Sequence, residues 1–188
     1  MELQFDLSEQ ATRSHILDTL LNAMDEDQRA TFDQVMQEVA VPDHHHHGFV
    51  EVCQTIENLD VDDAVKESMK GVYELLAAAE AQVHGCSIEE THFHEVGNAS
   101  GIRNALAICV AFWVLAPTKV VASEVQQGKG KVECAHGLMD IPAPATKAIL
   151  DSGLPVCEER LEGERCTPTS AAIIKYFVDE FSNTAQAW

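Results

Sequence analysis

Apolar side chains recur at helical spacing over much of the first two thirds of the chain. Residues three or four positions apart lie on one face of a helix, so this pattern predicts amphipathic helices. The predicted helices cover residues 14–24, 27–41, 60–83 and 102–115. Pro42, Gly85 and Pro117 follow three of them, where a proline or a glycine commonly ends a helix.

After residue 117, the long helical patterns give way to shorter segments of apolar and β-branched residues. They predict strands over 119–125, 131–134 and 154–157, and helices over 142–150 and 170–181. Residues 49–56 fit a strand and a helical turn equally well. Helices that alternate with short strands indicate an α/β fold, with α+β as the alternative. We expect one compact domain in which several helices surround a small sheet.

The same pattern divides the chain into four segments. We expect a helical N-terminal segment over 1–42, a histidine-rich loop over 43–48, an α/β domain over 49–181 and a frayed tail over 182–188. The longest apolar run, Ala105–Ala116, is too short for a membrane span of about 20 residues. The N-terminus has neither the basic nor the apolar region of a signal peptide, so we expect a cytoplasmic protein.

Acidic residues dominate the chain, which has 31 aspartates and glutamates against 12 lysines and arginines and a net charge of −19. Without a basic stripe to neutralise phosphates, nucleic acid and anionic membranes are disfavoured as partners. The charge is uneven, since residues 98–148 hold five basic and three acidic side chains. An anionic ligand would meet the least repulsion in this segment. The six cysteines form no CxxC pair, and we expect reduced thiols.

Four consecutive histidines, His44, His45, His46 and His47, stand in the polar segment after Pro42. Neutral imidazole is a good ligand for nickel, zinc, copper and iron. A histidine run on a loop offers ligands without a preformed geometry, which suits transient metal capture. A solvated polar loop explains the composition equally well.

A second group of histidines lies in the sequence His92-Phe-His94-Glu95. In an extended segment His92 and His94 point to one face and Phe93 to the other, toward the core. Two imidazoles followed by the Glu95 carboxylate predict part of a metal site or an acid–base pair. The alternative is a pair of hydrogen-bonded surface histidines.

A third group of residues surrounds the predicted helix starts in the second half. His136 lies between a strand and a helix that begins with prolines, and Lys129 and Lys131 precede it. Thr167-Pro-Thr169 opens another helix with hydroxyl groups. Helix N-termini bind anions through their free backbone N–H groups, so these residues predict an anion site. Ordinary turn and capping chemistry is the alternative.

Three strings of this sequence, taken in order, resemble one known family. They are HGCSIEETHFHEVG at 84–97, KVECAHGLMDIPAPAT at 131–146 and CTPTSAAII at 166–174. The chain is similar over 43–181 to the LarC family, the nickel insertion proteins of the nickel-pincer nucleotide pathway. The resemblance implies insertion of nickel into pyridinium-3,5-bisthiocarboxylic acid mononucleotide with consumption of CTP, which would be a lyase-class nickel chelatase activity.

The resemblance also implies roles for individual residues. His44, His45, His46 and His47, together with His92 and His94, would bind nickel, and Glu95 and His136 would take catalytic roles. The anionic nucleotide would be held by residues of the two helix starts and the preceding lysines, namely Lys129, Lys131, Pro142, Thr146, Thr167 and Thr169. The family's sulfur-bearing ligand suits nickel, because soft donors favour such metals.

The sequence departs from the family pattern at several places. The family's Gly-rich GxSGDM-type turn is replaced by FDLSEQATRSHILD, and its D-S-I-x-x-D pattern by Ser100-Gly-Ile-Arg-Asn104. Asp140 stands where the family has proline, and Ser170 where it has glycine. The family's CTP-binding half has no counterpart here. CTP with Mg or Mn is therefore expected only if a separate CTP-binding chain takes part.

Two alternatives to nickel insertion follow from these departures. The first is a catalytically degenerate relative that acts as a binding or regulatory subunit. The second is a generic divalent-metal buffer. A homo-oligomer is compatible with each of these interpretations.

Overall fold

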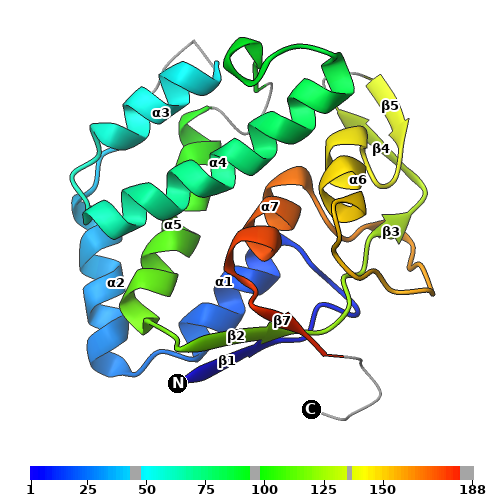
Figure 1. Ribbon diagram of the computed structural model, residues 1–188. Coiled ribbons are helices and arrows are strands. Elements are labelled where there is room, and N and C mark those ends of the chain that lie inside the picture. Colours follow the sequence, from blue (N-terminus) through cyan, green and yellow to red (C-terminus); the bar gives the residue numbers. More distant parts are fainter. Residues whose placement is uncertain (43–47, 94–97, 135–136, 183–188) are drawn as a thin grey trace. The chain divides into compact units, whose positions relative to one another are not determined.

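The computed structural model describes residues 1–42, 48–93, 98–134 and 137–182 (Figure 1). The chain forms two compact units, of which unit 1 comprises Met1–Ile16 with Pro117–Trp188, and unit 2 comprises Leu17–Ala116. Both units contain helices and unit 1 adds small sheets, which confirms the expected mixed α/β class. None of the helices in the described residues is long and apolar enough to cross a membrane.

A small parallel sheet organises unit 1. Its strands are β1 (Glu2–Phe5), β2 (Lys119–Ala122) and β7 (Glu180–Phe181), in the order β1-β2-β7. Glu2 pairs with Lys119 and Val121 with Glu180. Leu3 and Phe5 alternate with exposed residues along β1 and are buried, as expected for a strand with one covered face.

Two short antiparallel pairs and two helices complete unit 1. The pairs are β3 (Gly128–Lys129) with β6 (Gly163–Glu164), and β4 (Lys131–Cys134) with β5 (Gly137–Asp140). The helices α6 (Pro144–Asp151) and α7 (Pro168–Phe177) pack against each other. At Gly128 φ is +80°, and a Cβ atom would lie 2.1 Å from the carbonyl oxygen of Gly163, so only glycine fits.

Helices build unit 2. They are α2 (Glu26–Glu38), α3 (Phe49–Glu57), α4 (Asp63–His84), the 3₁₀ turn η1 (Ile88–Glu90) and α5 (Ala99–Leu115), while α1 (Arg13–Asn22) crosses the boundary between the units. The helix α4 packs against α3 and α5, and α2 packs against α5. The side chains of α5 are buried on nearly every face, which fits its uninterrupted apolar sequence.

The helix predictions for unit 2 are confirmed, and the ends of the helices follow from single residues. Gly85 ends α4 in the left-handed conformation, with φ of 69°. Asn98 caps α5 through a 2.7 Å hydrogen bond that its side-chain oxygen accepts from Gly101 N. Ser87 and Glu90 form a capping box at the start of η1. Residues 49–56, which fitted two structures equally well, lie in the helix α3.

Three predictions for unit 1 need correction. The strand from 119 ends at Ala122, because the backbone beyond it bonds to Phe5 and Leu7 outside the ladder. Residues 154–157 make only an isolated bridge between Val125 and Val156 among the described residues. The last helix stops at Phe177, and 180–181 form β7 instead, since the sheet offers this segment parallel hydrogen bonds beside β2. The strand β1 lies in a region where the apolar pattern predicted no strand.

Candidate functional site

Two segments of unit 2 that both carry histidines meet at an antiparallel bridge between Gly48 and His92. The bridge is supported by a 3.1 Å hydrogen bond from Phe49 N to the carbonyl oxygen of Thr91. Gly48 directly follows the four-histidine tract in the sequence. The structure therefore brings the residue that follows this tract next to His92, the first residue of the second histidine motif.

Phe93 anchors this segment to the core of unit 2. Its side chain is 1% exposed, and its ring makes an edge-to-face contact with Tyr73 at a centroid distance of 5.5 Å. His92, one position earlier, is exposed. The predicted alternation, with Phe93 inward and His92 outward, is confirmed for these two residues. Burial of Phe93 fixes the backbone and so presents the His92 imidazole on the surface.

Glu51 is a member of this site that the sequence did not reveal. Its carboxylate oxygen Oε2 accepts a 3.1 Å hydrogen bond from Gly48 N, which satisfies a free N–H group at the start of α3. A methyl group added at Gly48 would lie 3.2 Å from Glu51 Oε2 and 3.7 Å from His92 Nδ1. A carboxylate and an imidazole therefore flank the same glycine. The only signal in the sequence was a glutamate three residues after a loop glycine.

Several predicted site residues lie outside the described residues. They are His44, His45, His46, His47, His94, Glu95 and His136. Within the described ranges, no group of three or more His, Cys, Asp or Glu side chains could hold a metal ion. Among the described members, His92 and Glu51 offer one imidazole nitrogen donor and one carboxylate.

The predicted anion-binding residues belong to unit 1, where α6 and α7 run side by side. A 3.1 Å hydrogen bond from Lys175 Nζ to the carbonyl oxygen of Ser152 joins their C-terminal ends. Their N-termini consequently lie toward the same end of the pair (Figure 1). Each N-terminus carries a partial positive charge and free N–H groups. The anion site predicted from the sequence would use these two helix starts.

The α7 N-terminus is already capped by its own side chains. Thr167 Oγ1 accepts a hydrogen bond from Ser170 N at 3.3 Å, and Ser170 Oγ accepts one from Thr167 N at 2.8 Å. Thr169 is buried in the first turn. Cys166, just before the helix, is also buried, which raises the pKa of its thiol to about 12. Cys166 is therefore a core thiol rather than a nucleophile.

Thr146 in the first turn of α6 differs from these capped groups. The residue is fully buried, and its hydroxyl oxygen has no hydrogen-bond partner among the described residues. An unsatisfied buried polar group costs about 1–3 kcal/mol, so such groups are uncommon in folded proteins. The hydroxyl stands at a helix start, where it could donate to a bound anion. Pro142 lies two positions before the helix and is half-buried.

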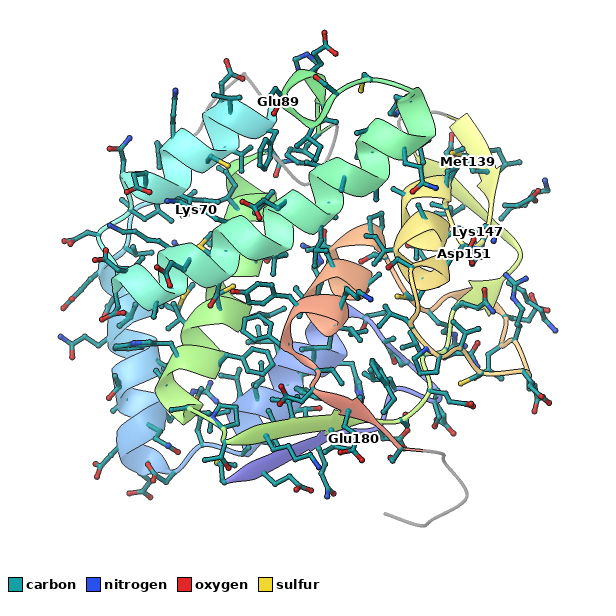
Figure 2. The ribbon with its side chains drawn as sticks, viewed as in Figure 1. Lys70, Glu89, Met139, Lys147, Asp151 and Glu180 are labelled. Atoms are coloured by element: carbon teal, nitrogen blue, oxygen red, sulfur yellow. The ribbon has the colours of Figure 1, made fainter. Side chains whose placement is uncertain are left out.

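The lysines expected to assist anion binding are paired with carboxylates. Lys129 Nζ lies 3.3 Å from Glu162 Oε1, and Lys131 Nζ lies 3.0 Å from Asp140 Oδ1 across the β4–β5 ladder. Figure 2 shows Lys147 and Asp151 close together on α6, where their charged atoms are 2.6 Å apart. All three lysines are largely exposed, and exposed pairs contribute only about 0–1 kcal/mol. An anion could therefore compete for these lysines.

Comparison with known proteins identifies the family. A family model described as nickel insertion protein matches residues 3–187. The chain is 39% identical over 142 residues to the pyridinium-3,5-bisthiocarboxylic acid mononucleotide nickel insertion protein of Desulfitobacterium hafniense strain DCB-2, covering 76% of this chain and 35% of the relative. The Staphylococcus epidermidis strain RP62A protein of the same name is 37% identical over 137 residues, covering 73% and 34% respectively.

A third relative of the same name, from Geobacillus kaustophilus, is 33% identical over 156 residues, with 80% of this chain and 38% of the relative covered. The chain thus spans about a third of the length of the curated relatives it matches. No solved structure matches it significantly. Because the family model covers nearly the whole chain, the chain belongs to the nickel insertion protein family.

Proposed function

We propose that this chain binds nickel and delivers or inserts it into pyridinium-3,5-bisthiocarboxylic acid mononucleotide during nickel-pincer cofactor biosynthesis. Family membership and the names of the relatives support this proposal. The observation that carries it is the Gly48–His92 bridge, which places the residue that follows the histidine tract in the sequence beside the first residue of the second histidine motif. Nickel is the cargo of this reaction rather than a permanent cofactor.

On the nickel side, His44–His47, His92 and His94 would supply imidazole nitrogens. Imidazole is a good ligand for nickel, and a carboxylate such as that of Glu51 would add a harder donor. His92 is exposed, so nickel bound there would be able to exchange. Exchange is what a delivery site needs, whereas a buried, closed site retains its metal.

On the nucleotide side, the N-termini of α6 and α7 would receive the phosphate or a carboxylate of the ligand. The unpartnered hydroxyl of Thr146 supports this assignment, since an anion would satisfy it. Pro142, Thr167 and Thr169 would shape the two helix starts. Lys129 and Lys131 would contribute positive charge after release from their carboxylate partners.

Glu95 and His136 would serve as the acid–base groups of insertion. CTP with Mg or Mn would enter this reaction if a CTP-binding partner chain takes part. The reaction would run in the cytoplasm, and assembly into a homo-oligomer is compatible with it.

Calorimetric titration with nickel tests the proposal. We expect nickel binding that tightens when the bisthiocarboxylate nucleotide is present, because its sulfur atoms share the metal. Nicotinic acid mononucleotide is the matched control, since it keeps the phosphate but lacks the thiocarboxylates and should not tighten nickel binding. Zinc titrations report the metal preference. Nickel binding that ignores both nucleotides would contradict insertion and favour a metal buffer or a degenerate relative.

A further inference from the structure

Unit 2 contains a cavity of about 310 Å³ that plays no part in the nickel proposal. Its lining residues come from the C-terminal turn of α2, from the residues just before α4 and its first turn, and from the end of α5, elements that can be located in Figure 1. The lining residues are Val35, Glu38, Asp60, Val61, Asp62, Val65 and Trp113. All of them belong to unit 2.

The lining combines an apolar floor with a negative rim. Three valines supply the apolar contacts and three acidic residues supply carboxylates, while no lysine, arginine or histidine among the described residues lines the cavity. Acidic side chains also outnumber basic ones in the sequence of unit 2, by eighteen to four. The cavity is therefore complementary to a positively charged ligand that also carries an apolar portion.

The three carboxylates differ in the hydrogen bonds that they make. Asp62 caps α4 by accepting a 2.9 Å hydrogen bond from Ala64 N, and Glu38 accepts one of 3.0 Å from Gln34 Nε2. Asp60 makes no hydrogen bond or ion pair within the described parts of the chain. Its charge is thus uncompensated at the rim, and the remaining carboxylate oxygens of the other two stay available as acceptors.

Trp113 is the aromatic wall of the cavity. Its side chain is 38% exposed, although tryptophan is usually well covered in a folded protein. Its indole N–H has no partner among the described residues. The face of an indole ring attracts cations, and tryptophan is enriched among residues that dominate binding energy at protein interfaces.

We propose that this cavity binds an arginine side chain presented by a partner polypeptide. A guanidinium group stacks on an indole ring and bonds carboxylates with two parallel N–H groups, whereas a lysine ammonium does neither as well. The methylene stem of the arginine would lie on the valine floor. A bare metal ion fits less well, because these three carboxylates do not form a metal-binding cluster in the described structure.

Fluorescence of Trp113 gives a direct test. Trp188→Phe removes the second of the two tryptophans in the sequence, so that Trp113 alone reports binding. The probe is Nα-acetyl-arginine amide, with the lysine and the uncharged citrulline analogues as comparisons. We expect saturable quenching by the arginine probe, weaker binding of the lysine probe and no saturable response to citrulline.

Variants separate the cavity from general electrostatic attraction. Asp60→Asn should weaken arginine binding about fivefold, in line with the strength of an exposed charge pair next to an aromatic ring. Glu67→Gln removes one charge from an exposed position of α4 outside the cavity and should leave binding unchanged. Urea unfolding of both variants checks that each is folded. Equal binding of lysine and arginine, a saturable citrulline response, or equal weakening by both substitutions would overturn the proposal.

Discussion

Gly48 and His92 pair in an antiparallel bridge, and the position of a Gly48 side chain would fall 3.7 Å from the Nδ1 atom of the His92 ring. The same glycine donates its N–H to Glu51, so an imidazole and a carboxylate are held on either side of it. This relationship places the residue that follows the histidine tract beside the first residue of the second histidine motif. It also makes Gly48 a position where a small change should affect nickel binding.

Gly48→Val tests whether nickel binding depends on the positions of Glu51 and His92 around Gly48. The backbone at Gly48 has φ of −70° and ψ of 149°, which valine adopts readily, so the change adds bulk without backbone strain. The new Cβ would press on Glu51 Oε2 and displace it from the glycine N–H. We expect nickel affinity to fall roughly tenfold, as for other disturbed residues around metal ligands. Calorimetry measures the affinity.

Glu51→Gln is the control for Gly48→Val. It keeps an oxygen acceptor for Gly48 N and removes the charge, so its effect isolates the contribution of the carboxylate to nickel binding. If Gly48→Val left nickel affinity unchanged while the protein stayed folded, the residues around Gly48 would have no role in the site.

His92→Ala should mainly weaken nickel binding, whereas Phe93→Ala should mainly lower the free energy of unfolding. His92 is exposed, so its loss should change the free energy of unfolding by less than about 0.5 kcal/mol while weakening nickel binding. Phe93 is buried against Tyr73, so its loss should cost about 3–5 kcal/mol. Urea unfolding of the metal-free proteins gives the stabilities. Destabilisation by His92→Ala with unchanged nickel affinity would identify His92 as a structural residue.

Thr146→Val examines the proposed anion site on α6. Valine has the shape of threonine without the hydroxyl, and that hydroxyl has no partner in the described chain. The free protein should therefore be as stable as before or more stable by up to about 1 kcal/mol. Affinity for nicotinic acid mononucleotide should fall about tenfold if the hydroxyl donates to its phosphate. Thr146→Ser retains the hydroxyl and should keep the affinity.

Asp6 should make stability depend on pH. Hydrogen bonds from the Ser8 hydroxyl at 2.6 Å and the Ser8 N–H at 3.0 Å lower the pKa of its carboxyl group. A lowered pKa in the folded state stabilises the protein above the unfolded-state value of about 3.9, and this stabilisation is lost as the pH falls through the folded-state value. The stability difference between the wild type and Asp6→Asn should shrink on acidification. Urea unfolding at several pH values measures it.

Ser8→Ala removes the hydroxyl donor and provides the comparison for Asp6. In that background, Asp6→Asn should show a smaller dependence on pH. A difference between wild type and Asp6→Asn that stays constant down to about pH 3 would mean that the carboxyl group is not stabilised by folding.

Structural features that are set by residues close together in the sequence could be predicted from local sequence patterns. The apolar run of α5 and the glycine that ends α4 were both readable from the sequence. The inward position of Phe93 followed from strand alternation. Each of these features is set by side chains within a few positions, where spacing and capping rules apply directly.

Features that depend on distant partners were not predictable in the same way. The strand β1 has four residues and gains its partner from β2, far along the chain. The ion pairs of Lys129 with Glu162 and of Lys131 with Asp140 arise from strand pairing that apolar periodicity does not specify. Glu51 joined the site only because the bridge places Gly48 beside His92. Long-range pairing, rather than propensity, decides such positions.

We propose that the histidine tract and His92 contribute to one nickel site. The most direct measurement is a double-mutant cycle in nickel calorimetry, using the wild type, His92→Ala, a variant with serine at 44–47, and the combination. We predict that either single change removes the tight nickel site and that the combined variant is little weaker than either. If the tract variant instead lost nickel equivalents while the affinity attributable to His92 stayed unchanged, the tract and His92 would not contribute to one nickel site.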